Sequence, residues 1–485
     1  MTGSILIEES PGRNARELGR SGQPRHAKRH PSRERRASGQ AARRADQRER
    51  LLAAITQLAI EGSAHDLTVA QIVALAGVSR PTFYEHFSDR EECFVRALEP
   101  AAEALLSALE TALASCEPQQ APSAAAAALV DFARAEPGLA RLLMSDSLAG
   151  GRPALDARDR LIERAAQAIE RALDRATTDA SISAISPRLM LGVTSRLLAV
   201  RLDRGEERLA DFQAELCVWL QSYSLPGARR RARARSIAPT EAPSPLISAR
   251  LRPPPALAHP PGRTTDAAFS ENQWLRIVFA TAAIVARDGY AAATVAEITR
   301  VAGLDTRAFY RLFACKEQAL ADARELMFGH AMALTAGAFA TAESWPERVW
   351  EASQAFAHCV EQNPTLAYVS FGESHAGGPV AMARLPQLID AFTIFLQEGY
   401  RYASPRPGSP AAPSPVALEA IVTAVFELCH LRSRRAAEQP EPQLHELAFI
   451  CLAPFLGATQ ASDFLRRRRA DDVASKALRS PAARR

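Results

Sequence analysis

The sequence contains few aromatic residues and little glycine, and these two shortages narrow its class. Aromatic residues make up 6% of the 485 residues and only 24 residues are glycine, whereas alanine, leucine and arginine are abundant. This composition is more typical of a helical globular protein than of a β-sandwich or a disordered chain. We therefore expect an all-α fold.

Long hydrophobic runs and closely spaced cysteines are also missing. No apolar run reaches the roughly 18 residues that a membrane-spanning helix needs, and no hydrophobic signal region precedes the arginine-rich N-terminal stretch. The seven cysteines are far apart and form neither a zinc knuckle nor a redox C-x-x-C pair. We expect free thiols in a reducing compartment, and hence a cytoplasmic protein with no metal site and no membrane partner.

Motifs of the common enzyme classes are missing as well. The chain has no glycine loop that would cradle a phosphate, no nucleophile elbow and no zinc-protease helix. His445 and Glu446 are adjacent, but the second histidine of a metal-binding helix is absent. The sequence therefore predicts neither catalytic residues nor a cofactor.

The charge distribution is more informative than the net charge of +5. Arginine is dense between Arg13 and Arg50, and the apolar periodicity of a helix is missing over residues 1–42. We expect a disordered basic arm there. Such an arm can lie along phosphates or enter a minor groove, and it can equally be a solvated tail.

Two segments of the chain are similar in sequence. Residues 68–87 read TVAQIVALAGVSRPTFYEHF and residues 294–313 read TVAEITRVAGLDTRAFYRLF, 226 positions later. A chain of this length is expected to form two or three domains, and the repeat favours two.

Each segment carries the signals of a helix-turn-helix. Thr68 and Gln71 predict a capping box that starts a short helix, and Gly77 occupies the turn, where a left-handed conformation suits glycine. Ser79 then caps the next helix. The equivalent residues of the second copy are Thr294, Glu297, Gly303 and Asp305.

The second helix of such a motif presents its N-terminal residues to base edges in the major groove. Arg80 and Arg307 suit guanine, while Thr82 or Thr306 suits a phosphate or a thymine methyl group. The predicted base-facing residues are Ser79, Arg80, Thr82 and Tyr84 in the first copy and Asp305, Thr306, Arg307 and Tyr310 in the second. The phenylalanines at i, i+4 spacing are assigned to the core: Phe83, Phe87, Phe309 and Phe313.

The spelling resembles the TetR family of bacterial transcriptional regulators. The first copy carries the pattern T-x-x-x-I-x-x-x-A-G-V-S-x-x-T-F-Y-x-H-F-x-x-R-E over residues 68–91, and the second keeps much of it. The resemblance implies phosphate contacts by Tyr84, His86, Arg90, Tyr310 and Lys316. The full expected DNA-binding set is Thr68, Ser79, Arg80, Thr82, Tyr84, His86, Arg90, Thr294, Asp305, Thr306, Arg307, Tyr310, Arg311 and Lys316.

The resemblance also implies the organisation of the chain. We expect two tandem TetR-like domains, each a helix-turn-helix bundle followed by a larger helical regulatory body. The expected boundaries are a basic arm over 1–42, domain 1 over 43–225 with its helix-turn-helix at about 44–92, a Pro/Arg-rich linker over 226–268, domain 2 over 269–465 with its helix-turn-helix at about 271–318, and a basic C-terminal tail over 466–485.

Family members dimerise through their last two long helices and hold a ligand in the helical body. Amphipathic segments near 188–222 and 416–458 would then form an intramolecular four-helix interface, making the chain a monomeric pseudo-dimer; a homodimer is the alternative. Ligand-pocket residues expected by resemblance are Trp350, His358, Tyr368 and Phe371, although an aromatic stripe is also typical of a core. The implied function is a repressor that binds a double-stranded DNA operator and is released by an unknown small-molecule effector.

Two departures of the second copy from the family pattern bear on DNA binding. Asp305 brings a carboxylate toward phosphates, and Leu312 stands where the first copy has His86; Arg307 and Arg311 can compensate. Two alternatives therefore stay open. In the first alternative, only domain 1 binds DNA and domain 2 is a dimerisation scaffold. In the second, the basic arm and the linker make the chain a non-specific nucleic-acid binder.

Overall fold

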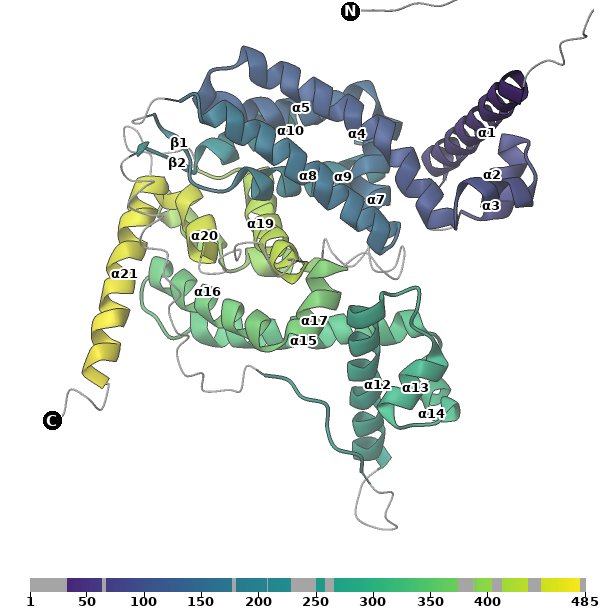
Figure 1. Ribbon diagram of the computed structural model, residues 1–485. Coiled ribbons are helices and arrows are strands. Elements are labelled where there is room, and N and C mark those ends of the chain that lie inside the picture. Colours follow the sequence, from purple (N-terminus) through teal and green to yellow (C-terminus); the bar gives the residue numbers. More distant parts are fainter. Residues whose placement is uncertain are drawn as a thin grey trace, which may run out of the picture. The chain divides into compact units, whose positions relative to one another are not determined.

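The computed structural model describes residues 33–62, 67–176, 180–206, 208–227, 250–257, 266–373, 387–388, 390–403, 412–434 and 446–479. Helices dominate these ranges (Figure 1). The strands found in them, β1 (Ile182–Ser183) and β2 (Ser224–Leu225), form one short antiparallel pair in which Ile182 faces Leu225. The all-α class is confirmed. Within the described ranges, no helix is long and apolar enough to cross a membrane.

The first half comprises residues up to 227. Its helices are α1 (Arg33–Glu61), α2 (Val69–Ala76), α3 (Arg80–His86), α4 (Arg90–Ser115), η2 (Pro118–Gln120), α5 (Ala121–Ala135), α6 (Pro137–Arg141), the π-helical η3 (Leu142–Asp146), α7 (Ser147–Ala149), α8 (Arg152–Leu173), α9 (Pro187–Asp203) and α10 (Leu209–Gln221).

The second half comprises residues from 250 onward. Its helices are α12 (Asp266–Asp288), α13 (Val295–Ala302), α14 (Thr306–Leu312), α15 (Lys316–Phe339), α16 (Trp345–Gln362), α17 (Pro364–Ala367), the π-helical η4 (Tyr368–Gly372), η5 (Gln397–Arg401), α19 (Pro415–Ser433), α20 (Leu447–Leu456) and α21 (Ala458–Arg479).

Several elements of the two halves recur at one constant spacing. The helices α2, α3 and α4 begin 226 positions before α13, α14 and α15. The same spacing separates the π-helical segments η3 and η4, which is informative because π-helical turns are rare. The predicted terminal helix pairs are also found, as α9 with α10 and as α19 with α20.

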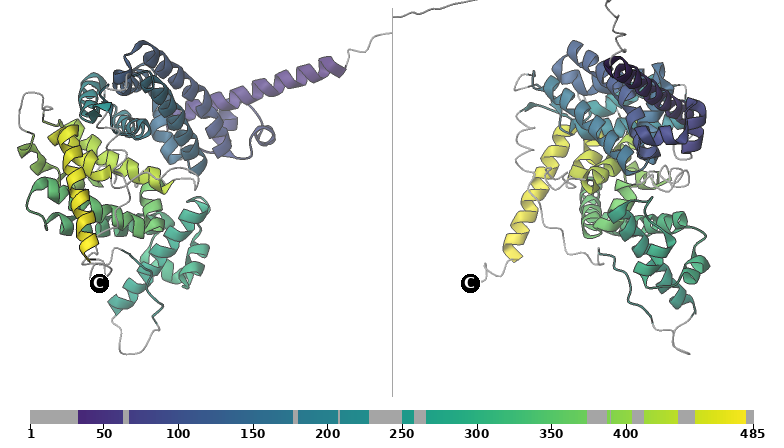
Figure 2. Two further views of the ribbon diagram at one scale, coloured as in Figure 1. Left: turned by 60° about the vertical axis from the view of Figure 1, so that its left-hand side comes forward. Right: turned by 45° about the vertical axis from the view of Figure 1, so that its right-hand side comes forward.

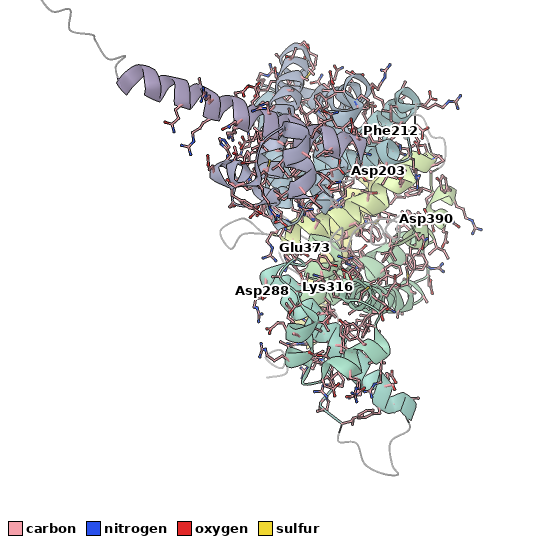
Figure 3. All side chains as sticks on the ribbon, turned by 90° about the vertical axis from the view of Figure 1, so that its right-hand side faces the viewer. Asp203, Phe212, Asp288, Lys316, Glu373 and Asp390 are labelled. Atoms are coloured by element: carbon pink, nitrogen blue, oxygen red, sulfur yellow. The ribbon has the colours of Figure 1, made fainter. Side chains whose placement is uncertain are left out.

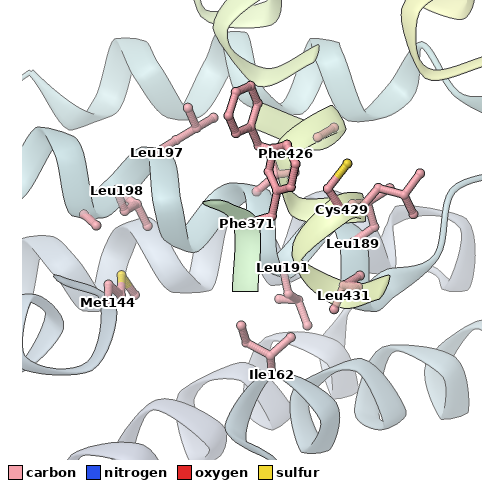
Figure 4. Packing of buried hydrophobic residues seen from close by; sticks show 14 of the residues in the cluster. Met144, Ile162, Leu189, Leu191, Leu197, Leu198, Phe371, Phe426, Cys429 and Leu431 are labelled. Carbon is pink, nitrogen blue, oxygen red and sulfur yellow. The ribbon is translucent and has the colours of Figure 1, made fainter. Parts of the chain in front are cut away.

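The two halves share one apolar core through α9 and α19, which pack against each other. Figure 4 shows this packing, with Leu189 and Leu197 from α9 and Phe426 and Cys429 from α19. The Phe371 ring of η4 lies edge-on to the Phe426 ring, with 5.4 Å between ring centroids. Helices α10 and α19 also pack together, and Figure 2 gives two further views of the elements.

Two helix boundaries differ from the sequence predictions. Helix α1 begins at Arg33 rather than near residue 44. Alanine, arginine and glutamine favour a helix even without an apolar stripe, so apolar periodicity did not predict the start of α1. The described residues of α1 up to Glu49 belong to a compact unit separate from residues 50–485.

At the other end, α21 carries the helix through residues predicted as a tail, to Arg479. Residues 250–257 of the predicted linker are not helical, and they contact the junction of α16 and α17, where the Leu251 amide donates to Asn363 Oδ1 at 2.8 Å. The rest of the predicted arm (1–32), of the linker (228–249 and 258–265) and of the tail (480–485) lies outside the described residues.

Candidate nucleic-acid interface

The first head, which is α2 and α3 with their turn, is built by local capping. The Thr68 amide donates to Gln71 Oε1 at 2.9 Å and the Gln71 amide donates to Thr68 Oγ1 at 3.3 Å, so the predicted capping box is present. Helix α2 ends at Gly77, whose φ of 63° is left-handed. A side chain there would strain the turn. Ser79 then starts α3 by accepting from the Thr82 amide at 3.2 Å.

Helix α3 has a buried face and an open face. Phe83 and Phe87 are buried and their ring centroids lie 5.7 Å apart, so the predicted core assignment is confirmed. Tyr84 is 50% exposed although it is a large aromatic residue, and Arg80, four residues earlier, is exposed as well. The open face therefore presents a phenol and a guanidinium, groups that suit phosphates and base edges.

Two arginines of the first head contact backbone carbonyls. Arg90 Nη1 donates to the Leu67 carbonyl oxygen at 2.9 Å, and Arg50 Nη1 donates to the Ala76 carbonyl oxygen at 3.1 Å. Arg50 thereby satisfies an end of α2 that has no partner within the helix. These bonds tie the C-terminal end of α2 to α1, and the residue before the cap of α2 to α4.

The second head, which is α13 and α14 with their turn, repeats this geometry. Gly303 has the same φ of 63°, and Asp305 Oδ1 accepts from the Ala308 amide at 2.6 Å to start α14. Lys316, the counterpart of Arg90, donates to the Ala293 carbonyl oxygen at 3.0 Å. Arg276, the counterpart of Arg50, donates to the Gly303 carbonyl oxygen at 3.3 Å.

The open face of α14 is also aromatic and cationic. Phe309 and Phe313 are buried, as predicted, whereas Tyr310 is 59% exposed. Thr306, Arg307 and Arg311 are exposed along this short helix, and Arg311 Nη2 donates to Gln273 Oε1 at 3.3 Å. The acid Glu85 of α3 is replaced by Arg311 in α14, so α14 carries two arginines and no acid within its bounds.

One predicted feature of the second head is wrong. Thr294 Oγ1 accepts from the Glu297 amide at 3.2 Å, but the capping box is only half formed because Glu297 pairs elsewhere. Its carboxylate accepts from Arg300 Nε at 2.8 Å and Nη2 at 2.7 Å. A cation three residues along the helix competes with the neutral amide, and a charged donor forms the stronger bond.

The remaining residues of the predicted set lie around these faces. Thr68, Ser79, Thr294 and Asp305 are exposed, but a side-chain oxygen of each accepts a hydrogen bond from a backbone amide in the first turn of its helix. Thr82 is half-buried, with its hydroxyl 2.8 Å from Ser79 Oγ. His86 is half-buried near the end of α3. Their roles in DNA binding stay predictions.

Apolar cavities lie in the bodies of both halves. One, of about 60 Å³, is lined by Thr335, Phe356, Phe392, Leu396, Val422 and Leu447 among others. The other, of about 30 Å³, is lined by Leu109, Met144, Arg158, Ile162 and Leu191 among others. Leu109 and Thr335 are 226 positions apart, so the two cavities share one equivalent lining position.

None of the four residues predicted to form a ligand pocket lines either cavity. Trp350 and Phe371 are buried in the core and His358 is half-buried. Tyr368 donates from its hydroxyl to Glu373 Oε1 at 2.9 Å. Burial and the neighbouring Glu373 carboxylate raise the pKa of the Tyr368 phenol to about 12, so it stays a neutral donor at pH 7.

A buried ionic cluster joins α8 and α9 of the first half to α19 of the second. Arg196 Nε donates to Glu427 Oε2, and Arg158 Nη1 lies 3.9 Å from Glu427 Oε1. Burial raises the pKa of Glu427, but the charges of Arg196, His430 and Arg158 outweigh this and lower it to about 2. Nearby, Asp159 accepts from Arg434 Nε at 2.7 Å and lies 3.3 Å from His430 Nε2.

Arg50, Arg276 and Arg196 were missed in the sequence analysis, for two different reasons. Arg50 and Arg276 each lie 27 residues before the turn glycine of their head, so a comparison of the repeats extended upstream would have found them. Arg196 and Glu427 are 231 positions apart, and nothing in their local sequence distinguishes them from charges on a solvated helix face.

Residues 51–97 match the family model described as bacterial regulatory proteins, tetR family. The matched segment contains the end of α1, the whole first head and the first turns of α4. A search of curated proteins found no match to the chain. The family match supports a DNA-binding transcriptional regulator, with the first head as its helix-turn-helix.

Proposed function

We propose that the chain is a ligand-responsive repressor in which two tandem TetR-like domains act as an intramolecular pseudo-dimer on one DNA operator. The first domain holds the first head and the second domain holds the second. A regulator of this kind ordinarily finds its second head on a partner subunit. In this proposal one chain supplies both.

The pairing of α9 with α19 is the observation that carries the proposal, because its contacts are complementary rather than symmetric. Both helices start at a serine cap followed by proline, Ser186–Pro187 and Ser414–Pro415. Arg196 is the tenth residue after its cap and Glu427 the thirteenth. The residues at the matching positions of the other helix are alanines, Ala424 and Ala199.

A symmetric pair of two α9 helices would therefore bury two Arg196 side chains opposite alanine. A symmetric pair of two α19 helices would likewise bury two Glu427 carboxylates without a counter-charge. An unpaired buried charge costs several kcal/mol. This asymmetry favours pairing of the first half with the second half over pairing of like with like.

Other polar contacts also join the two halves. Arg201 Nη2 donates to Glu419 Oε2 at 2.7 Å, and the Tyr223 hydroxyl donates to the Ile450 carbonyl oxygen at 2.9 Å. These two bonds join a donor of the first half to an acceptor of the second half, whereas Arg434 of the second half donates to Asp159 of the first. A covalent connection between the halves makes their pairing independent of protein concentration, unlike that of a homodimer.

The two heads differ in sequence, so the operator is asymmetric. Arg80 is the first residue of α3, whereas Arg307 is the second residue of α14, after Thr306. The centres of the two half-sites lie about one helical turn of DNA apart. The effector binds the helical body more tightly when the heads do not fit the groove. DNA and effector therefore weaken each other's binding by the same factor.

A second candidate function is favoured by Leu312 and Asp305. Leu312 is half-buried where the first head has His86, and it packs against the core. In this candidate only the first head binds DNA, and the second domain serves as a built-in dimerisation scaffold.

Selection of bound sequences from a random DNA pool, combined with light scattering, tests the proposal. We expect a monomer in solution that enriches an asymmetric site of two parts. A palindromic site bound by an obligate homodimer refutes the pseudo-dimer, and no enrichment at all refutes sequence-specific regulation.

Substitutions in the two heads separate the two candidates. We expect Tyr84→Ala and Tyr310→Ala each to weaken operator binding by roughly tenfold, about 1.4 kcal/mol, because each removes an exposed phenol. Ile394→Ala, at a 63% exposed position of the second half outside the heads, is the control. Full affinity in Tyr310→Ala with loss in Tyr84→Ala supports the scaffold candidate instead.

A further inference from the structure

The helix that precedes each head, α1 or α12, is held at its C-terminal end by an arginine, but the two arginines come from the same half. In the first half, Arg141 at the end of α6 donates to the Ile60 carbonyl oxygen at 3.1 Å and also to the carbonyls of Ala59 and Gly62. These carbonyls belong to the last turn of α1 and the residue after it. A cation here donates to carbonyl oxygens that lack partners within the helix, and it interacts favourably with the negative end of the helix dipole.

The equivalent arginine is missing from the second half. Helix α6 ends at Arg141 and α17 ends at Ala367, in each case directly before a π-helical segment. The two residues are 226 positions apart, but an alanine side chain has no donor. The last turn of α12 therefore receives no such bond from the end of α17.

Arg152, the first residue of α8 in the first half, occupies this role for α12. Its Nη2 lies 3.2 Å from the Ala286 carbonyl oxygen and 3.4 Å from that of Val285, and its Nη1 lies 3.4 Å from that of Arg287. All three acceptors are in the last turn of α12. One guanidinium of the first half thus caps α12, the helix that precedes the second head.

The guanidinium of Arg152 is itself held in place. Its Nε donates to Glu373 Oε1 at 3.0 Å, and its centre lies 5.5 Å from the centroid of the Tyr368 ring. Glu373 is buried and also accepts from the Tyr368 hydroxyl. A planar guanidinium can make these contacts together, whereas a lysine ammonium is a single point charge. Glu373 and Asp288, which ends α12, are labelled in Figure 3.

We propose that Arg152 is a positioning residue for the second head, so that the first half controls the orientation of both heads. Helices α13 and α14 pack on α12, so the second head follows any movement of the last turn of α12. Because Arg152 begins α8, a rearrangement of α8 in the first half moves the second head, while Arg141 keeps the first head on its own body. This inference rests on the proposed function for its effect on DNA.

Hydrogen exchange of the full-length protein without DNA tests the contact directly. In Arg152→Ala, we expect the amides of residues 286–289 to exchange roughly tenfold faster because the last turn of α12 loses its cap, while amides of α9 and α19 exchange at the wild-type rate. Arg152→Lys should have a smaller effect. The control is Arg164→Ala, which removes an exposed pair with Glu103.

Footprinting on the selected operator tests the consequence. Arg152→Ala should lower affinity about tenfold at the half-site of the second head and leave the other half-site unchanged. Arg141→Ala should do the reverse. A merely structural defect weakens protection of both half-sites together.

Each outcome decides one of the two ideas. Unchanged exchange in α12, or equal loss at both half-sites, overturns the role of Arg152. If the wild-type protein protects one half-site only, the proposed function fails, and the exchange rates alone then support or overturn the anchoring of α12 by Arg152.

Discussion

Replacing Glu427 with glutamine should strongly destabilise the contact between the two halves. The substitution keeps the volume of the side chain but removes the negative charge that Arg196 and Arg158 share. Glu427 is 0% exposed, so water cannot replace it. Breaking a buried ion pair by removing one partner costs about 3–5 kcal/mol.

Urea unfolding at pH 7, followed by circular dichroism, measures this loss. The matched control is Glu103→Gln, which breaks an exposed pair with Arg164 and should cost at most about 1 kcal/mol. Substituting Arg196 and Glu427 together by leucine should recover only part of the stability, because Arg158 stays buried and keeps Asp159, 3.5 Å away, as its counter-charge. A loss for Glu427→Gln no larger than that of the control would refute the assignment of Glu427 as the buried counter-charge.

Three further expectations concern the same junction and the heads. The pKa of Glu427 is lowered to about 2. The pKa of Asp159 is lowered as well, because the interactions with His430 and the neighbouring arginines outweigh burial. As pH falls, these carboxylates therefore take up protons in the unfolded chain before they do so in the folded protein. Melting temperatures should drop as pH falls from about 4.5 to about 2, and Glu427→Gln should flatten this dependence. Gly192→Ala should cost about 1–3 kcal/mol in urea unfolding, because an added Cβ would overlap the Glu427 carboxylate. A neutral effect would mean that α9 and α19 are not packed this closely. Ser79→Ala should remove the cap of α3 and cost about 1 kcal/mol, and an unchanged melting temperature in that variant would contradict the capping geometry.

Signals of short range made the two heads predictable. Thr68, Gly77 and Ser79 act on backbone groups within four residues of themselves, so the order of the residues is enough to start, turn and restart the chain. The phenylalanines at i, i+4 spacing indicated the buried face for the same reason. Glu297 shows the limit of such reasoning, because Arg300 draws its carboxylate away from the cap.

The sequence by itself determined the helical class, the two heads and the terminal helix pairs, because each depends on residues close together in the chain. Only the tertiary structure decided which charges meet. Arg196 and Glu427 find each other across 231 positions, and Arg152 reaches α12 across more than 130. A charged residue on an amphipathic helix looks the same in sequence whether its face meets water or a partner. Burial and the geometry of packing make the difference.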